Sequence, residues 1–476
     1  MRSGRTTGAI RTPRLPSRRD DCRALAATTA EPGMTTAEPG ATTAEPGATT
    51  AEPGTTTASP PTKTVTTPVM TTDTRRSTVT TEQVLTVPSP RETGCPFDVP
   101  RPYRHAAEEG PVVKAATLSG GECWMITRHE EVHAVLGDRR FSADALLPNF
   151  PLMTEELRKM VAESRKSTPE IDEQEHIRRR RMLTAEFKGK RVEALRPQIQ
   201  SMVDGILDGM IADGGPVDLV SRFAQPVPAA VICLLLGVPF EDHQFFKDRA
   251  RLMLDFRVGP EAMMKARIEL TEYMNKLTAE KQQQPDEALI STLLTKGELA
   301  TDEVAGTALL LLLGGLETTS SMLSLSTLAL LQHPGQLAQL RADSSLTKGA
   351  VEELLRYLTV VQNGLARVAL EDVEIGGQLI KAGDGVLCML SIANRDETVY
   401  PGGHELDLRR GARTHLSFGF GIHQCVGQTL ARAELQIALE TLLRRLPELR
   451  LAVPAEELRF RDTLGFYGVE ELPVDW

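Results

Sequence analysis

The segment Phe418–Gly427 reads Phe-Gly-Phe-Gly-Ile-His-Gln-Cys-Val-Gly and combines one thiol with three glycines. Glycines let a backbone approach a flat, bulky group closely, because they carry no Cβ. Cys425 comes just before an apolar stripe with helical spacing, and a helix N-terminus supplies N–H groups and partial positive charge that stabilise a thiolate. This combination predicts a cysteine that serves as a metal ligand.

Simpler roles fit parts of this segment. A lone cysteine is most often an inert, buried side chain in a tight turn, which would explain Cys425 alone but not the ten-residue pattern. The dinucleotide-binding pattern G-x-G-x-x-G is broken, because Gln424 stands at its last glycine position. One cysteine with one histidine, His423, two residues away is too sparse for structural zinc.

A second unusual segment, Gly314–Thr319, follows the five leucines Leu309–Leu313 with two glycines, an acid and two hydroxyls. Each glycine costs a helix ~1 kcal/mol relative to alanine, and Glu317 is costly to bury without a partner. Such dense departures from helical preference usually mark a functional site. The simpler alternative is a glycine pair that lets two helices approach closely.

An acid and a base, Glu353 and Arg356, stand three residues apart on another expected helix. Taken alone, such a pair is best explained as an exposed ion pair worth ~0.2–0.5 kcal/mol. On its residues alone it therefore indicates no chemistry.

Helical spacing of apolar residues predicts the elements that position these segments. The longest helix runs from Thr301, the expected N-cap, to His333, where Pro334 stops it. About thirty residues at ~1.5 Å each make a rod of ~45 Å, long enough to cross a whole domain. Apolar runs and turn signals predict further elements: helices over Ile199–Ile211 and Pro228–Val238, and a hairpin of Pro111–Leu118 with Glu122–Thr127 around Ser119-Gly120-Gly121.

The composition of the 476 residues limits the class of protein. A hydrophobic fraction of 41% supports one large domain or about three ordinary ones, and excludes a wholly disordered chain. The net charge of −10 provides no field that favours nucleic acid or anionic lipid. No run approaches the ~18 apolar residues of a membrane helix, the six cysteines form no C-x-x-C pair, and no apolar signal segment follows Met1. A cytoplasmic protein that binds neither membrane nor nucleic acid is expected.

The first ninety residues differ from the rest. Residues 27–54 repeat the unit Ala-Thr-Thr-Ala-Glu-Pro-Gly, which offers no large apolar side chain to bury. Six arginines without an acid in the first 19 residues resemble a transit peptide, but a flexible tail, or a start codon assigned upstream of Met34 or Met70, explains them more simply. We expect residues 1–92 to be a disordered low-complexity tail and residues 93–476 to be one folded domain.

Together and in this order, the three motifs resemble those of the cytochrome P-450 family of haem-thiolate monooxygenases. The resemblance covers Cys95–Trp476 and is most specific around Cys425. Within the family it is greatest to soluble actinobacterial enzymes that oxidise secondary metabolites and foreign compounds, as Gly215–Val220, Ala393–Asp396 and Leu472–Trp476 indicate. The fold it implies is mainly α with small β-sheets, a single large haem domain with a long central helix.

The resemblance implies a complete site for haem b. Cys425 would be the proximal thiolate on the haem iron, where it favours O–O cleavage by donating electron density, and Phe418 would pack beside the sulfur. Glu353 and Arg356, with Arg410, would form a buried ion-pair cluster behind the haem rather than an exposed pair. Bases far apart in the sequence would bind the haem propionates: His176, Arg180, Arg367 and His423.

Glu317 and Thr318 match the family's acid–alcohol pair beside bound oxygen. A hydroxyl and a carboxylate can relay the protons that cleavage of dioxygen requires, through water, inside an apolar cavity. The pair implies that one oxygen atom of O2 is inserted, by hydroxylation or epoxidation, into a lipophilic small molecule. The resemblance places apolar segments around the substrate: Ala145–Met153, Leu252–Phe256, Leu310–Thr318, Val360–Leu365 and Leu464–Tyr467.

The resemblance also implies partners, because the sequence contains no flavin or nicotinamide fingerprint. Electrons would come to a monomer from a separate ferredoxin and ferredoxin reductase, with NAD(P)H used indirectly. A basic island between Arg178 and Arg191 is expected either to steer an acidic ferredoxin or to be a solvated helix face. Two other functions stay open, nitric oxide reduction with direct use of NADH and a haem-binding sensor or scaffold without monooxygenase activity, and Glu317–Thr318 weighs against both.

Overall fold

The computed structural model describes residues 85–476, apart from 93, 95, 118–119, 153, 156–157, 160–161, 163–172, 256–257 and 462–464. Some expectations lie wholly or partly outside the described residues: the repeats and tail up to residue 84, the start of order at Cys95, the turn at Ser119, and the pocket positions Met153, Phe256 and Leu464.

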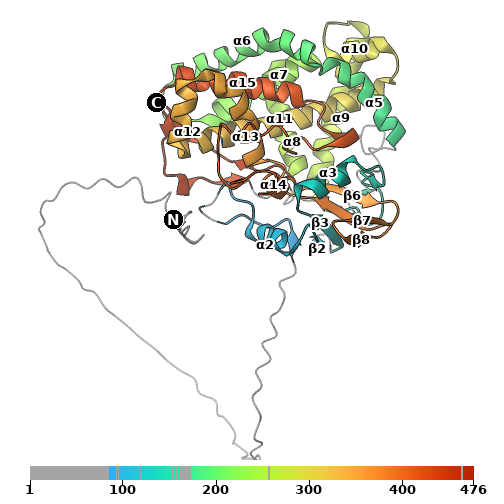
Figure 1. Ribbon diagram of the computed structural model, residues 1–476. Helices are drawn as coiled ribbons and strands as arrows, with labels where there is room; N and C mark the ends of the chain where they lie inside the picture. Colours follow the sequence, from blue (N-terminus) through green and yellow to red (C-terminus); the bar gives the residue numbers. More distant parts are fainter. Residues whose placement is uncertain are drawn as a thin grey trace, which may run out of the picture. The chain divides into compact units, whose positions relative to one another are not determined.

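Helices make up most of the described chain, as expected (Figure 1). Their bounds are α2 (Arg101–Glu109), α3 (His129–Gly137), α5 (Glu173–Glu186), α6 (Gly189–Asp213), α7 (Pro226–Leu236), α8 (His243–Leu254), α9 (Pro260–Gln283), α10 (Leu289–Lys296), α11 (Thr301–Gln332), α12 (Pro334–Ala342), α13 (Thr347–Leu358), α14 (Leu390–Ala393) and α15 (Gln428–Arg445). Short turns of 3-10 or π helix lie between them: η1 (Val220–Ala224), η2 (Phe240–Asp242), η3 (Ser344–Leu346), η4 (Gly421–His423) and η5 (Ala455–Glu457).

Helix α11 is 32 residues long and packs against α7, α9, α13 and α15 in the middle of the helical part (Figure 1). Its N-terminus differs from the expectation, because Thr301 is the first helical residue and not the cap. The Glu303 carboxylate reaches back instead and accepts the Ala300 N–H at 2.8 Å. Pro334 ends α11 and at once begins α12, since proline fits the first turn of a helix.

By length and hydropathy α11 is the one described helix that could cross a membrane, with a mean hydropathy of 1.4 over 18 residues. The structure buries 67% of that window inside the protein. Packing against other helices therefore accounts for its apolar surface, and α11 is a core helix. The buried stripe of α6 is of the same kind, with Ile199, Val203 and Leu207 fully buried as expected.

The described strands form one six-stranded sheet and smaller pairings. In the large sheet the order is β1-β2-β3-β9-β6-β4, and β2 and β3 are antiparallel with Lys114 opposite Trp124, which confirms the expected hairpin. Strand β6, which carries Arg367, is held between β9 and β4. The bounds are β1 (Thr86–Val87), β2 (Val112–Thr117), β3 (Glu122–Ile126), β4 (Phe141–Ser142), β5 (Val217–Asp218), β6 (Leu365–Ala369), β7 (Val373–Ile375), β8 (Gln378–Ile380), β9 (Gly385–Cys388), β10 (Arg450–Leu451), β11 (Phe460–Arg461), β12 (Gly468–Val469) and β13 (Pro473–Asp475).

Tertiary packing begins earlier than residue 93. Val87 is fully buried, and its strand β1 pairs in parallel with β2. The Arg91 guanidinium lies over the Tyr467 ring, 3.9 Å from its centroid. Residues 85–92 therefore pack as part of the folded domain, although the sequence placed them in the tail.

The pair Glu353–Arg356 is wholly buried, so the exposed ion pair favoured by the residues alone is wrong. Arg356 donates to both carboxylate oxygens of Glu353, at 2.7 and 2.8 Å, and also to the backbone carbonyls of Asn394 and Gly403. The Glu353 carboxylate accepts two more hydrogen bonds, from Arg410 Nε at 3.2 Å and from the Asp407 N–H at 3.0 Å. The cluster thus joins α13 to the loop that leads to Phe418–Gly427.

Breaking this cluster should be costly. Arg356→Ala leaves the Glu353 carboxylate buried without its main partner, so we expect the free energy of unfolding in urea to fall by about 3–5 kcal/mol. Lys276→Ala is the matched control, because Lys276 and Glu280 form an i,i+4 pair with side chains 79% and 61% exposed, and its loss should stay below about 0.5 kcal/mol. Equal losses in the two variants would contradict the role given to burial.

Candidate active site

The loop Phe418–Gly427 has the close backbone approaches that its glycines predict. Gly419 and Gly421 adopt φ of +66° and +74°, a region that favours glycine. A Cβ on Gly421 would lie 2.2 Å from the Leu136 carbonyl oxygen, so α3 and this loop touch through backbone. The Cys425 N–H donates to the Phe418 carbonyl at 2.8 Å and closes the loop, and α15 begins three residues later.

Cys425 is accessible, unlike the buried Cys123, Cys233 and Cys388, although protein atoms crowd around it. That burial raises the pKa of the Cys425 thiol, while the N–H groups of Gly427 and Gln428 and the positive charges of Arg180 and Arg432 lower it. The pKa of Cys425 is raised overall. The N–H groups at the start of α15 lower it, as expected, but burial outweighs them. The sulfur is thus accessible to a ligand, and a cation beside it would favour its ionisation.

The four bases singled out in the sequence meet in space from three different elements, α5, β6 and η4. The rings of His176 and His423 lie with centroids 4.1 Å apart, and His176 Nε2 is 3.0 Å from the Ile422 carbonyl oxygen. Burial, together with the positive charges of His176, Arg367 and Arg180, lowers the pKa of His423 to about 3. Charges of one sign gathered in a buried place form a receptor for anions.

A stripe along the middle of α11 is open, although the rest of this part of the helix is buried. Leu310 is 38% exposed, and Gly314 and Thr318, four and eight residues further on, are accessible too. Residues at this spacing share one helix face, so a hollow runs along it. The two glycines differ: a Cβ on Gly314 would meet nothing within 4 Å, whereas one on Gly315 would lie 3.4 Å from Ile232 of α7. Close packing against α7 therefore explains why residue 315 is a glycine, and the open face of α11 explains why residue 314 is one.

Thr318 and Glu317 point to different neighbours. The Thr318 hydroxyl donates to the Gly314 carbonyl at 2.7 Å, on the open face of α11. Glu317 is 6% exposed, and its carboxylate accepts a hydrogen bond from the guanidinium of Arg461 on β11. Arg461, 4% exposed, is a site residue that the sequence analysis missed, because nothing in its short strand distinguishes it from other arginines of the chain.

Phe418 contacts Arg432, a second residue that the sequence analysis did not identify. The Arg432 guanidinium lies 4.5 Å from the centroid of the Phe418 ring, and it donates to Glu352 at 2.7 Å. His415 Nε2 lies 3.1 Å from the same carboxylate. Glu352 is the neighbour of Glu353 in the sequence, and no spacing signal separates their roles.

The basic island contains fewer free charges than the sequence suggests. Arg178 and Arg179 both bond Glu175 and Glu303, and Arg179 is buried, so neither is a free surface charge. Arg181, Lys188 and Lys190 are exposed. Lys188 lies close to the thiol loop, because the ring of its neighbour Phe187 comes within 4.0 Å of the Cβ position of Gly427.

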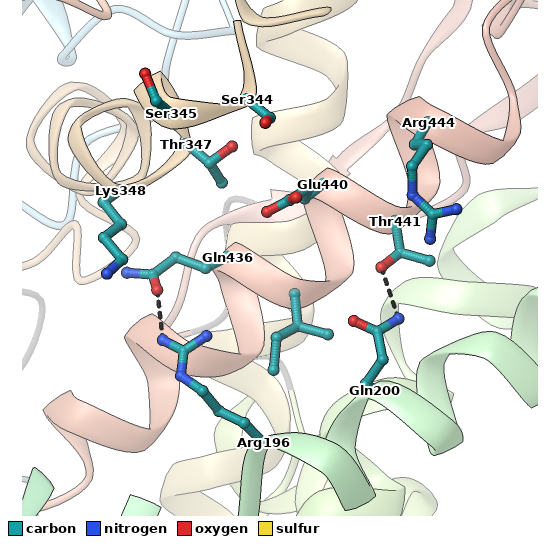
Figure 2. A pocket seen from close by; sticks show the side chains of 11 residues that line it. Arg196, Gln200, Ser344, Ser345, Thr347, Lys348, Gln436, Glu440, Thr441 and Arg444 are labelled. Atoms are coloured by element: carbon teal, nitrogen blue, oxygen red, sulfur yellow. Dashed lines mark hydrogen bonds between the residues drawn. The ribbon is translucent and has the colours of Figure 1, made fainter. Parts of the chain in front are cut away.

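A polar hollow of about 430 Å³ elsewhere in the fold is not this site. Figure 2 shows side chains of α6, α15 and the start of α13 around it, with Arg196 bonded to Gln436 and Gln200 bonded to Thr441. The lining residues from α15, Gln436 to Arg444, lie in the second half of that helix, roughly 15–30 Å from its Cys425 end at ~1.5 Å per residue. Its polar lining differs from the apolar pocket expected for the substrate.

Comparison with known proteins shows to which family this chain is similar. A family model described as Cytochrome P450 matches residues 253–450. Cytochrome P450-SU2 of Streptomyces griseolus is 54% identical over 392 residues, covering 82% of this chain and 97% of that protein, and the vitamin D3 dihydroxylase of the same species is 45% identical over 405 residues, covering 84% and 99%. The solved structure of mycinamicin VIII C21 methyl hydroxylase MycCI from Micromonospora griseorubida, bound to mycinamicin VIII, has a TM-score of 0.76 at 37% identity and covers 83% of this chain and 100% of that one.

An accessible cysteine on a glycine loop, a hollow along a central helix and a cluster of bases define a haem-thiolate protein. The chain belongs to the cytochrome P450 family, and it is a monooxygenase of the actinobacterial type. This confirms the fold class expected from the resemblance: mainly α, with small sheets and a long central helix.

Two observations of this structure indicate that the residues present fit the haem of the family. The Cys425 sulfur is accessible inside the protein, as an axial ligand to iron must be. Arg180 and Arg367 carry positive charge beside His423, and propionate carboxylates placed among these bases would counteract the lowering of the His423 pKa.

The cluster of Glu352, His415 and Arg432 next to Phe418 should make the free energy of unfolding depend on pH. Burial opposes ionisation of Glu352, but hydrogen bonds from His415 and Arg432 lower its pKa to about 2, below the ordinary 4.5. A carboxyl whose pKa is lower in the folded than in the unfolded state stabilises the folded protein at pH values above 4.5. This stabilisation is lost as the pH falls toward 2. Because the Glu352 side chain is 13% exposed, we expect Glu352→Gln to cost about 3 kcal/mol of unfolding free energy at pH 7 and about half of that at pH 3. A loss that did not shrink on acidification would show that the charge of Glu352 is not what stabilises.

Proposed function

We propose that this monooxygenase inserts one oxygen atom of O2 into a lipophilic small molecule by hydroxylation or epoxidation, with electrons from a separate ferredoxin and its reductase. The observation that carries the proposal is the accessible, crowded sulfur of Cys425 beside a cluster of bases that includes Arg180 and His423. When bound, haem b supplies the iron that binds and activates dioxygen. The chain's own residues do the rest.

Cys425 is the proposed axial ligand, and its loop holds the sulfur by backbone. The N–H groups of Gly427 and Gln428 donate toward the sulfur and stabilise its negative charge. Phe418, whose ring lies 4.5 Å from the Arg432 guanidinium, would pack beside the sulfur. His176, Arg180, Arg367 and His423 would bind the haem propionates and hold the cofactor in its site.

Thr318 is the proposed donor on the oxygen side. Its hydroxyl donates its one hydrogen to the Gly314 carbonyl, which leaves the oxygen lone pairs to accept from water. To donate toward the open face, the hydroxyl would first rotate away from Gly314. The open stripe at Gly314 gives room for small molecules beside it. A positioned hydroxyl that passes protons contributes about 10²–10⁴-fold in typical enzymes. Its place on the hollow favours oxygen chemistry over nitric oxide reduction and over a sensor without turnover.

The substrate proposal rests on the apolar lining and on relatives. Leu310 and Leu313 face the hollow from α11, and Val360 and Leu365 follow α13. One relative is named a vitamin D3 dihydroxylase, and the similar solved structure holds mycinamicin VIII. We therefore propose a lipophilic ring system, of steroid, terpenoid or macrolide type, as the substrate of a soluble, cytoplasmic and monomeric enzyme.

The carbon monoxide spectrum tests the proposal. The dithionite-reduced, haem-loaded protein should show a strongly red-shifted Soret band with carbon monoxide, as thiolate ligation requires, and Cys425→Ala should lose it. Cys233→Ala, at a cysteine buried in α7, is the matched control and should keep the band. A band typical of histidine ligation in the unaltered protein would remove the monooxygenase proposal.

The ferredoxin surface is testable by charge reversal. Lys188→Glu with Lys190→Glu should slow electron transfer from a surrogate acidic ferredoxin several-fold at low ionic strength, and less at high salt, because screening weakens steering. Lys265→Glu with Lys381→Glu makes the same change in net charge at exposed positions elsewhere and should have little effect. Equal slowing by both pairs would assign the effect to net charge and not to a docking surface.

A further inference from the structure

Arg395, which follows α14, is a deeply buried cation with one unsatisfied nitrogen. The residue is 4% exposed, and its Nη2 donates to the backbone carbonyls of Phe97 and, at 2.9 Å, of Tyr357. Its Nη1 is buried too, and it has no hydrogen-bond partner among the residues that the structure describes. Asp98 Oδ1 lies 3.5 Å from Nη1, close enough for an ion pair but without the geometry of a hydrogen bond. A buried donor without an acceptor is costly, so this N–H needs a partner.

A second guanidinium with an unsatisfied N–H lies beside the first. Arg91, in the segment after β1, donates through Nη1 to the Asp98 backbone carbonyl, the one that follows the Phe97 carbonyl bound by Arg395. The Nε of Arg91 is buried and has no partner in the described part of the chain. Two consecutive carbonyls therefore hold two guanidiniums close together, and each guanidinium has a buried nitrogen left for another acceptor.

Positive charge outweighs negative charge in this cluster. Arg104 Nη1 lies 3.4 Å from Asp98 Oδ2, so the Asp98 carboxylate is shared by three guanidiniums. Burial lowers the pKa of Arg91 to about 10, with the charge of Arg395 acting in the same direction and Tyr467 and Asp98 acting against it. Burial also lowers the pKa of Arg395, and the charge of Arg104 adds to that effect. The cluster would thus be stabilised by one more negative charge.

Two other acids close to Arg395 are engaged with other groups. Asp396, the next residue, accepts the His129 N–H at 3.0 Å and pairs with Arg128 at 3.7 Å. The Glu353 carboxylate is taken up by the buried cluster described above. A water molecule would satisfy the N–H groups of Arg91 and Arg395 but would leave their charge uncompensated. An anion would do both, because a guanidinium only donates hydrogen bonds and an anion accepts them.

We propose that the buried nitrogens of Arg91 and Arg395 bind a single halide ion, chloride in solution. An oxyanion such as phosphate favours the paired N–H groups of one guanidinium. Here each guanidinium offers one buried nitrogen instead, an arrangement that suits one compact, spherical acceptor between them.

The ion would join three parts of the chain that lie far apart in the sequence. Arg91 belongs to the segment after β1, and Arg395 follows α14. The Arg91 guanidinium also lies over the ring of Tyr467, next to β12. Neither arginine belongs to the proposed haem site, so the halide site does not depend on the proposed function.

Chloride should stabilise the haem-loaded protein at constant ionic strength. Stepwise replacement of sodium gluconate by sodium chloride should raise Tm by about 2 °C or more and should saturate, because an ion that binds only the folded state stabilises it by mass action. Gluconate carries the same charge and screens equally, but it is too bulky for a buried site. A Tm that does not respond to chloride would overturn the proposal.

Two variants assign the effect to the cluster. Arg91→Met keeps an apolar stem over Tyr467 but removes the charge and the buried Nε, so its Tm should no longer depend on chloride. Arg101→Met is the matched control, because it removes the same charge from a side chain that is 64% exposed and pairs with Glu92 at 3.9 Å. It should keep the full chloride effect. An equal chloride effect in both variants would place the ion elsewhere and overturn the proposal.

Bromide locates the ion without any variant, so the proposal stays testable even where Arg91→Met does not fold. In crystals of the unaltered holoprotein soaked in sodium bromide, the anomalous difference map should show a peak between Arg91 Nε and Arg395 Nη1. The absence of a peak there would show that water solvates these groups, and the proposal would be wrong. A peak in the crystal together with a Tm that ignores chloride would mean binding at crystal concentration only, which overturns it equally.

Discussion

A thiol crowded by protein atoms gives up its proton only when enough positive charge stands beside it. At Cys425 the backbone N–H groups, Arg180 and Arg432 supply part of that charge, and burial still raises the pKa of the thiol. In the proposed assignment the haem iron supplies the remaining charge, and the cofactor completes the loop. Much of the surrounding structure follows from this one imbalance. The glycines bring α3 and the loop together, and Glu353, Arg356 and Arg410 anchor the chain that leads into it.

The second constraint is that one helix serves a core and a reaction site at the same time. α11 is apolar enough to be the centre of the fold, and most of its side chains are buried. Its open stripe at Leu310, Gly314 and Thr318 gives up packing to leave room for small molecules. Glu317 lies off this stripe and is neutralised by Arg461, so the helix carries a charge without exposing it to the apolar hollow.

The sequence indicated the centre of the site well and its supports poorly. Cys425 and the bases around His423 could be found because a cofactor imposes residue types on fixed motifs, and the structure brings these residues together. The burial of Glu353 and Arg356 followed from the resemblance and not from their spacing, which is that of a common surface pair. Arg461 and Arg432 could not be found, because their partners lie far away in the sequence or on another helix. The basic island was overcounted, since the acid Glu303 that neutralises Arg179 belongs to α11.

The pairing of β13 with β5 has a consequence for how the protein is made. The Leu472 N–H donates to the Asp218 carboxylate across 254 residues, and Val474 lies opposite Val217. Asp218 also caps η1, which leads into α7 beside the central helix. On the ribosome, the early half of the chain therefore waits for the late half before this corner closes. Until then the apolar face of α7 lacks part of its cover, so slow translation between residues 220 and 470 would lengthen the time in which the nascent chain depends on chaperones.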